Sequence, residues 1–337
     1  MPLPIITHLG AETHVTGSCH LMKANGVTIM VDCGLAQGRD TLREIKDWPV
    51  KPSEIDYLFL THAHIDHIGR VPELIQNGFK GEIICSHPTK ALLNPMLRDA
   101  MRFSGSSRQS ADRIQEKIDD LAWGFEFGQT FDLEKGIAFK MGRAGHILGS
   151  SFIRFQDSTS GWSVLFSGDL GAANTPILPD PEIPEQADLV ILESTYGNRL
   201  HDDRVQRIKR LGNVLSQALA DGGKVFVPAF ALGRTQELIY EMDRIFSNPK
   251  YIEMFPELQG KSHPPVFVDS PLGLKITDIY SRLAEYWDKK AQDLHRQGDH
   301  PIDFEGLFAV ENHQHHIQLC DMKGPAIILA GSGMCTG

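Results

Sequence analysis

The sequence predicts an α/β protein in two parts, and three observations support this prediction. Its 337 residues suffice for two domains, or for one large domain that carries an insertion. The first half is dominated by short apolar runs that glycine-containing turns separate, which is typical of strands. After Asn198, strands alternate with amphipathic helices, which indicates right-handed crossovers and a mainly parallel sheet. The boundary is therefore expected near residues 197–204.

Each element of the first half is predicted from its own pattern. Two helices are expected at about 89–103 and 111–121, because Ile114, Ile118 and Leu121 recur at spacings of four and three. The apolar runs that we expect to form strands are 5–9, 20–24, 28–32, 57–61, 82–86, 138–141, 151–156, 163–166 and 189–192.

The second half opens with a helix whose apolar stripe ends at Gly222-Gly223, a good C-terminal stop. Further helices are expected at about 235–246 and 274–287. The histidines at 313, 315 and 316 are expected in a solvated turn before the last strand. The expected strands are 224–230, 265–269, 307–310 and 326–330.

Composition limits the possible classes of protein. The chain is 41% hydrophobic and 23% charged, and it contains no apolar run of the roughly 18 residues that would suggest a membrane span. The N-terminus lacks the layout of a signal peptide. Five scattered cysteines without a C-x-x-C pair favour buried reduced thiols in a cytoplasmic protein. The formal charge of −10 argues against a broadly basic surface that binds nucleic acid, but it does not exclude nucleic acid as a substrate.

The most informative segment is residues 62–67, which read His-Ala-His-Ile-Asp-His directly after an apolar run. Three imidazoles and a carboxylate within six positions are typical ligands for zinc and similar divalent metals. His62 and His64 project to the same side of an extended segment, and a turn would let Asp66 and His67 reach a second point. The alternative is a solvated histidine-rich loop.

Two later segments supply further candidate ligands. His146 stands in a glycine-flanked loop after a strand, and Asp169 directly follows another strand. Each alone would suit a purely structural role. Combined with the first segment they complete a dinuclear site, with His62, His64 and His146 on one metal, Asp66 and His67 on the other, and Asp169 bridging both.

Asp32 ends another expected strand, immediately before Cys33 and Gly34. We expect it to hold a ligand histidine by a hydrogen bond and to fix the tautomer of that ring. A turn-capping aspartate before Gly34 has comparable weight. The ligands suit two zinc ions, and Mn²⁺ is the alternative.

These residues occur in an order that resembles a known family. Asp32, then residues 62–67, His146 and Asp169 are similar to the four ordered motifs of the metallo-β-lactamase fold. The surroundings resemble its β-CASP branch of RNA-processing nucleases, which includes ribonuclease J and the endonuclease of pre-mRNA 3′ ends, and the stand-alone bacterial and archaeal members look most similar. The segments that carry this resemblance are Gly10-Ala11, Thr16-Gly17-Ser18, Asp32-Cys33-Gly34, His146-Ile147-Leu148-Gly149-Ser150, Glu193-Ser194-Thr195-Tyr196-Gly197, Pro228-Ala229-Phe230-Ala231-Leu232-Gly233-Arg234, Asp269-Ser270-Pro271 and Gly331-Ser332-Gly333-Met334.

The resemblance implies a fold and an activity. Residues 1–200 would form an αββα sandwich core and residues 201–337 an inserted β-CASP cap. The activity implied is hydrolysis of single-stranded RNA, by endo- or exonuclease action, with two zinc ions and a bridging hydroxide as nucleophile. Asp66 would orient that hydroxide, and Glu193, which fits the acidic residue of the first β-CASP motif, would assist the general acid. Asp32 would support the site.

The loop after the last expected strand is a candidate for substrate binding. Backbone N–H groups at Ser332 and Gly333 could cradle a phosphate, whereas a tight structural turn is an equal alternative. By resemblance, the family continues past this loop and supplies two further histidines there. We therefore expect a shortened form that lacks those histidines and the closing strands of the core.

Two other functions remain open from the sequence. One is a non-catalytic RNA-binding or assembly subunit, or an inactive fragment, that keeps the fold. The other is a small-molecule metallo-hydrolase such as a thioesterase or lactonase, against which the cap argues. We expect RNA as the partner, no membrane association, and allow for a homodimer.

Overall fold

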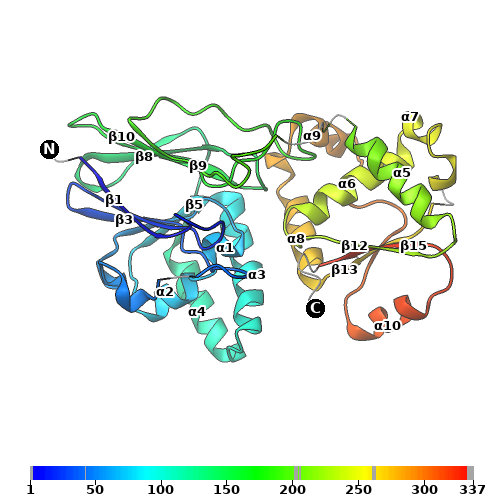
Figure 1. Ribbon diagram of the computed structural model, residues 1–337, viewed down its shortest axis with the longest axis horizontal. Coiled ribbons are helices and arrows are strands. Elements are labelled where there is room, and N and C mark those ends of the chain that lie inside the picture. Colours follow the sequence, from blue (N-terminus) through cyan, green and yellow to red (C-terminus); the bar gives the residue numbers. More distant parts are fainter. Residues whose placement is uncertain (1–2, 42, 201–203, 205, 260–262, 332–337) are drawn as a thin grey trace. The chain divides into compact units, whose positions relative to one another are not determined.

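The computed structural model describes residues 3–41, 43–200, 204, 206–259 and 263–331 (Figure 1). The chain divides into two compact units. Unit 1 comprises Met1–Asn174 and Asp180–Gly197, and unit 2 comprises Thr175–Pro179 and Asn198–Gly337. The assignment of residues 1–200 to a core and 201–337 to a cap stays a prediction.

The first sheet of unit 1 has six strands in the order of the sequence. Its first three strands pair antiparallel as a meander, and the strands from β3 onward pair in parallel. The carboxyl ends of β3 and β4 therefore lie at the same edge of the sheet. The six strands are β1 (Ile5–Gly10), β2 (Cys19–Ala24), β3 (Val27–Val31), β4 (Tyr57–Phe59), β5 (Glu82–Ser86) and β6 (Ala122–Phe125).

The second sheet of unit 1 has five strands in the order β11-β10-β9-β8-β7. All its neighbours are antiparallel except β10 and β11, which are parallel. The strands are β7 (Thr130–Asp132), β8 (Ile137–Arg143), β9 (Ser151–Asp157), β10 (Ser163–Phe166) and β11 (Leu189–Ile191).

The two sheets of unit 1 face each other across one apolar core, to which both contribute buried side chains. At its centre, Phe59 of the first sheet makes edge-to-face contacts with Phe139 and Phe155 of the second, with ring centroids 4.9 and 4.8 Å apart. Burial of a phenylalanine side chain contributes about 1.5–3 kcal/mol to stability. This shared core therefore fixes the position of one sheet relative to the other, including the strand ends.

Helices cover the outer face of the first sheet (Figure 1). Ser86 and Ser107 cap the two longer ones, because their hydroxyls accept hydrogen bonds from the backbone N–H groups of Thr89 and Ser110. Among the described residues of unit 1, no α-helix follows α4. The helices are α1 (Ile65–Ile68), α2 (Val71–Gln76), α3 (His87–Phe103) and α4 (Arg108–Leu121).

Unit 2 contains a four-stranded sheet in the order β12-β15-β13-β14, and every neighbouring pair is parallel. The alternation of strands and helices predicted a parallel sheet, and this is confirmed. The strands are β12 (Lys224–Pro228), β13 (Val266–Asp269), β14 (Leu307–Ala309) and β15 (Ala326–Ala330). The helices are α5 (Arg207–Leu219), α6 (Arg234–Ser247), α7 (Pro249–Ile252), α8 (Pro271–Arg282), α9 (Lys289–Arg296) and α10 (His313–Asp321).

The expected α/β class is confirmed, and one local prediction is wrong. The histidines expected in a solvated turn lie on α10 instead. Asn312 begins this helix, because its side-chain oxygen accepts a hydrogen bond from the backbone N–H of His315. The sequence pattern also missed the short helices α1, α2 and α7, together with α9, β6 and β7. Within the part of the chain that the structure describes, no helix is both long and apolar enough to span a membrane.

Candidate metal centre

The candidate ligands lie on loops that leave the ends of three strands. Residues 62–67 follow β4 of the first sheet, whereas His146 and Asp169 follow β8 and β10 of the second. Ser151 joins the two sheets at this point, because its backbone N–H and its hydroxyl both donate to the carbonyl oxygen of Thr61, at 2.9 and 3.1 Å. Segments separated by about a hundred positions are thereby brought to one place.

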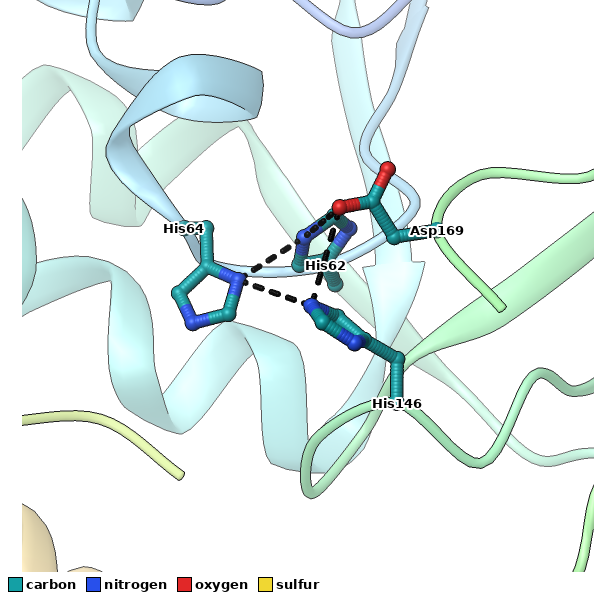
Figure 2. A group of neighbouring side chains, drawn as sticks. All are labelled: His62, His64, His146 and Asp169. Carbon is teal, nitrogen blue, oxygen red and sulfur yellow. Dashed lines mark hydrogen bonds and ion pairs between the residues drawn. The ribbon is translucent and has the colours of Figure 1, made fainter. Parts of the chain in front are cut away.

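Three imidazole nitrogens converge on one point (Figure 2). His64 Nδ1 lies 3.1 Å from His62 Nε2 and 3.1 Å from His146 Nε2. Asp169 Oδ2 completes the group, at 3.8 Å from His62 Nε2 and 3.6 Å from His146 Nε2. One ligand atom from each of these four residues lies within 4.8 Å of the others. Tetrahedral zinc–nitrogen bonds of about 2.0–2.1 Å place neighbouring nitrogens roughly 3.3 Å apart, so these imidazole distances fit a single ion.

The hydroxyl of Thr61 fixes the tautomer of His62. It donates to Asp32 Oδ2 at 2.9 Å, so it accepts at the 3.1 Å contact with His62 Nδ1. The Nδ1 atom of His62 therefore carries the ring proton. Its Nε2 lone pair faces His64 and His146, as metal coordination requires.

A second group of donors lies on the other side of Asp169. Asp169 Oδ1 is 3.2 Å from His67 Nε2, and Asp66 Oδ2 is 3.9 Å from the same nitrogen. The two carboxylate oxygens of Asp169 thus face two different sets of ligands. A carboxylate placed in this way has one oxygen available to each set.

Asp32 holds the Nδ1 side of the His67 ring, opposite the nitrogen that faces the site. Asp32 is 1% exposed, and its Oδ2 accepts a hydrogen bond from His67 Nδ1 at 2.7 Å. The backbone N–H of Thr61 donates to Oδ1 at 2.8 Å. The aspartate adopts a left-handed backbone conformation with φ of 59° directly after β3, which re-aims its side chain into the interior. A carboxylate that receives several hydrogen bonds holds the histidine tautomer and ring orientation.

A chain of hydrogen-bonding groups continues from Asp32 to the surface. Ser18 Oγ donates to Asp32 Oδ2 at 3.3 Å, and His20 Nε2 lies 3.4 Å from that hydroxyl. His20 Nδ1 lies 2.9 Å from Nδ1 of the exposed His8. Because Asp32 only accepts, Ser18 must donate to it and His20 must donate to Ser18. The acceptor at one end therefore sets the direction of the whole chain.

Electrostatics push the pKa values of the site residues apart. Burial, followed by the neighbouring imidazoles, lowers the pKa of His62 well below its usual value. Burial opposes charge on His67 too, but Asp32 and Asp169 outweigh it and raise the pKa of His67 well above the usual range. Burial also opposes charge on Asp169, yet His67 holds the pKa of that carboxyl at about 2. The carboxylates of Asp32 and Asp169 therefore favour a positive charge at His67. A metal ion bound to Nε2 would supply such a charge.

Hydrogen bonds to the backbone hold the two remaining loops. Ser150 Oγ accepts from the backbone N–H of His146 at 2.9 Å, which closes the loop on which that ligand lies. Glu193 Oε1 accepts from the backbone N–H of Leu170 at 2.9 Å, one residue after Asp169. The carboxylate of Glu193 therefore stabilises the loop that presents Asp169.

Gly34 lets two backbone segments meet beneath the site. A Cβ atom at this position would overlap with the carbonyl group of Asp66. The neighbouring backbone is tied across the same contact, because the N–H of Ser18 donates to that carbonyl oxygen at 2.8 Å. Only glycine fits here without moving the segment that carries Asp66.

The donor set fits the divalent metal that the sequence implies. Four imidazoles and two carboxylates converge. The Nδ1 atoms of His62 and His67 each donate to a hydrogen-bond acceptor, Thr61 and Asp32 respectively, which leaves Nε2 for a metal. Neutral imidazole and carboxylate are preferred ligands of zinc, and they also suit manganese. His62, His64, His146 and Asp169 would hold one ion, and Asp66, His67 and Asp169 a second.

The structure brings together all six predicted ligands and places Asp32 against His67. Glu193 lies in the neighbouring loop, where it contacts backbone rather than a ligand. Ser332 and Gly333 lie outside the described residues. Sequence reasoning missed Thr61, whose position directly before His62 was the available signal, and it missed the contribution of Ser18 and His20.

Comparison with known proteins agrees with this geometry. Residues 13–213 match the metallo-beta-lactamase superfamily and residues 235–337 match the Beta-Casp domain. The chain is 33% identical over 332 residues to Ribonuclease TTHA0252 of Thermus thermophilus, and the match covers 98% of this chain and 73% of the relative. It is 31% identical over 340 residues to Endoribonuclease YSH1 of Candida glabrata, covering 97% of this chain but 42% of that protein.

A plant relative gives the same result. Cleavage and polyadenylation specificity factor subunit 3-I of Arabidopsis thaliana is 33% identical over 286 residues, which cover 82% of this chain and 39% of that protein. The family matches account for both parts of the sequence, and the converging histidines and aspartate are a group that could hold a metal ion. The chain therefore belongs to the β-CASP RNA-processing nucleases of the metallo-β-lactamase superfamily, a family of metal-dependent hydrolases that act on RNA.

Proposed function

We propose that this protein hydrolyses phosphodiester bonds of single-stranded RNA with two zinc ions in the centre described above. The observation that carries the proposal is the position of Asp169, whose Oδ2 faces His62 and His146 while its Oδ1 faces His67. One carboxylate with imidazole nitrogens facing both of its oxygens suits a pair of cations better than a single one. RNA as the substrate rests on the ribonuclease and endoribonuclease relatives.

The chemistry follows from the donor arrangement. The six ligand residues would hold a zinc pair, which would supply a hydroxide nucleophile near neutral pH and would neutralise charge that develops on the phosphoryl oxygens. A bridging position for that hydroxide is part of the proposal. Thr61 keeps the Nε2 lone pair of His62 directed into the site, and Asp32 does the same for His67. Asp66, beside His67, is the residue we expect to orient the nucleophile.

Glu193 has two roles in this proposal. Its hydrogen bond to the backbone of Leu170 positions the Asp169 loop. By resemblance it would also assist protonation of the leaving oxygen. Mutation to glutamine separates the roles, because glutamine keeps a hydrogen-bond acceptor for the Leu170 N–H but cannot carry a proton for the leaving group.

The direct test incubates the metal-loaded chain with end-labelled single-stranded RNA, with and without a chelator. The expected result is cleavage of RNA that the chelator abolishes and that added Zn²⁺ or Mn²⁺ restores. DNA of the same sequence and duplex RNA serve as substrate controls. The pattern of fragments separates internal cleavage from stepwise removal of terminal nucleotides.

The matched protein control is Asp169→Asn, which keeps the size of the side chain but weakens the bridge. Metal analysis should give about two ions for the parent chain and fewer for this variant. Intact RNA with the fully loaded parent chain would contradict the proposal. Cytoplasmic location and the absence of membrane binding belong to the same proposal. So does assembly as a homodimer, which sedimentation of the loaded protein tests.

A further inference from the structure

A second cluster of reactive groups lies in unit 2, on residues that the metal centre does not use. His316 Nδ1 is 2.6 Å from Asp269 Oδ2, and Cys320 Sγ is 3.7 Å from His316 Nε2. Because the carboxylate of Asp269 accepts, the ring proton of His316 resides on Nδ1. The Nε2 lone pair therefore faces the thiol. A thiol, an imidazole and a carboxylate stand in the order needed to remove a proton from sulfur.

The elements of unit 2 hold this order in place. His316 and Cys320 are four residues apart on α10, so they lie on the same face of the helix. Asp269 is the last residue of β13, a strand paired with neighbours on both sides. The contact between Asp269 and His316 thus connects a fixed strand end to the helix that carries the cysteine.

Lys224 supplies a positive charge at the C-terminal end of α10, where the helix itself disfavours a negatively charged sulfur. Cys320 is in the last turn of α10, where unpaired carbonyl groups would disfavour a negative sulfur. The ammonium group of Lys224 donates to the carbonyl oxygens of Leu319 and Cys320, at 2.7 Å each. These two contacts place a positive charge beside the residue and satisfy the carbonyl groups.

Cys320 also differs from the other described cysteines in its exposure. Cys19, Cys33 and Cys85 are buried, as the sequence predicted, whereas Cys320 is exposed and so departs from that prediction. Cys335 lies outside the described residues. The described thiol that has an imidazole beside it is therefore also the one that solvent reaches.

We propose that Cys320 is a thiol-modification site that reacts with low-molecular-weight disulfides. His316 takes the proton of the thiol, and the sulfur of Cys320 attacks one sulfur of the disulfide. A new S–S bond forms to Cys320, the original S–S bond breaks, and the departing thiolate receives the proton from His316. Cys320 is oxidised and the departing half of the disulfide is reduced. Asp269 is a positioning residue that keeps the His316 ring in the required tautomer.

The test uses the full chain with Cys335→Ser and the probe oxidised glutathione at neutral pH. Intact-mass measurement over time gives the rate at which a single glutathione adduct forms. His316→Gln is compared with His315→Gln, which removes an exposed histidine from the same helix. We expect the parent and His315→Gln to react at equal rates, at least about tenfold faster than His316→Gln. Asp269→Asn should fall between them, and Cys320→Ser should give no adduct.

The buried thiols report on folding in the same experiment. A variant that loses its fold exposes Cys19, Cys33 and Cys85 and acquires more than one adduct, so such a variant is replaced by His316→Asn. Equal rates for the His316 and His315 variants would overturn the proposal. So would the absence of an adduct on the parent chain, or a parent rate no higher than that of free cysteine with the same disulfide. None of these outcomes depends on metal or on cleavage of RNA.

Discussion

Each of the two units of this molecule contains a short run of histidines, and the two runs differ in the structures they form. Residues 62–67 of unit 1 contain three histidines and an aspartate, and residues 313–316 of unit 2 contain three histidines. The first run meets His146 and Asp169 from distant segments and forms a compact set of ligand atoms. The second run lies on α10, where His313 and His315 are exposed. Histidine content alone does not distinguish them.

The difference lies in what surrounds each ring. In both runs an aspartate holds an Nδ1 atom, Asp32 for His67 at 2.7 Å and Asp269 for His316 at 2.6 Å. Asp32 is buried and its histidine faces a second carboxylate, whereas His316 faces a thiol. The same supporting pair can therefore serve a metal ligand or a general base, and the group opposite Nε2 decides which.

The largest expected effect comes from removing a ligand from the first run. His64→Ala should lower metal affinity at the three-histidine position by more than the about 10- to 100-fold that loss of a ligand's hydrogen-bond partner causes. His64 contributes the nitrogen that lies 3.1 Å from both of its partners. Metal analysis should fall from about two ions to about one per chain, because Asp66, His67 and Asp169 remain.

His315→Ala is the matched control from the second run. It removes an exposed histidine from α10 and should leave the metal content unchanged. An equal loss of metal in the two variants, or an unchanged metal content in His64→Ala, would contradict the distinction between the two runs. Circular dichroism of both variants shows whether the folds are retained.

The next largest effect comes from the two supporting aspartates. Asp32→Asn should lower affinity at the Asp66–His67 position by about 10- to 100-fold, because an amide no longer fixes the His67 tautomer as an acceptor-only carboxylate does. Asp269→Asn should not alter metal content. Titration with zinc against a competing chelator measures both. Equal affinities for Asp32→Asn and the parent chain would mean that Thr61 and packing suffice to orient His67.

Much of this architecture could be predicted from the sequence, for a physical reason. Apolar runs and turn residues act locally, so strands such as β5, β10 and β15 have the bounds expected. The ligands were predictable because imidazoles and carboxylates that gather at strand ends are typical of metal sites and of few other structures. Their convergence was expected from the carboxyl ends of strands meeting at one edge.

What the sequence could not give depends on long-range contacts. Thr61 has the sequence pattern of an ordinary strand residue, and only the fold places its hydroxyl between Asp32 and His62. The histidines of α10 were expected in a solvated turn because they stand just before the last strand, whereas capping by Asn312 begins a helix there. The contact between Cys320 and His316 required the helix, so it was not predictable once a turn was assumed.

A further effect is expected in the pH dependence of stability. Burial lowers the pKa of His20 from its usual 6.5 to about 4. Between these two values the unfolded chain binds more protons than the folded chain does, so stability falls as pH drops from about 6.5 to about 4. In the metal-free protein, His20→Gln should show a weaker loss of stability than the parent over this range in urea unfolding. His315→Gln, an exposed histidine of the second run, should follow the parent curve.

The smallest expected effect concerns Ser18, which joins His20 to Asp32. Ser18→Ala removes one of several hydrogen bonds to the Asp32 carboxylate, and that bond is long at 3.3 Å, whereas the two from Thr61 are 2.8 and 2.9 Å. Affinity at the Asp66–His67 position should therefore fall only about two- to fivefold, in keeping with less than about 1 kcal/mol for a weak hydrogen bond. Thr61→Val, which also deprives His62 of its acceptor, should cost more and should affect both metal positions. If Ser18→Ala weakened metal binding as much as Asp32→Asn, the chain from His8 to Asp32 would set the orientation of His67, and Thr61 would be secondary.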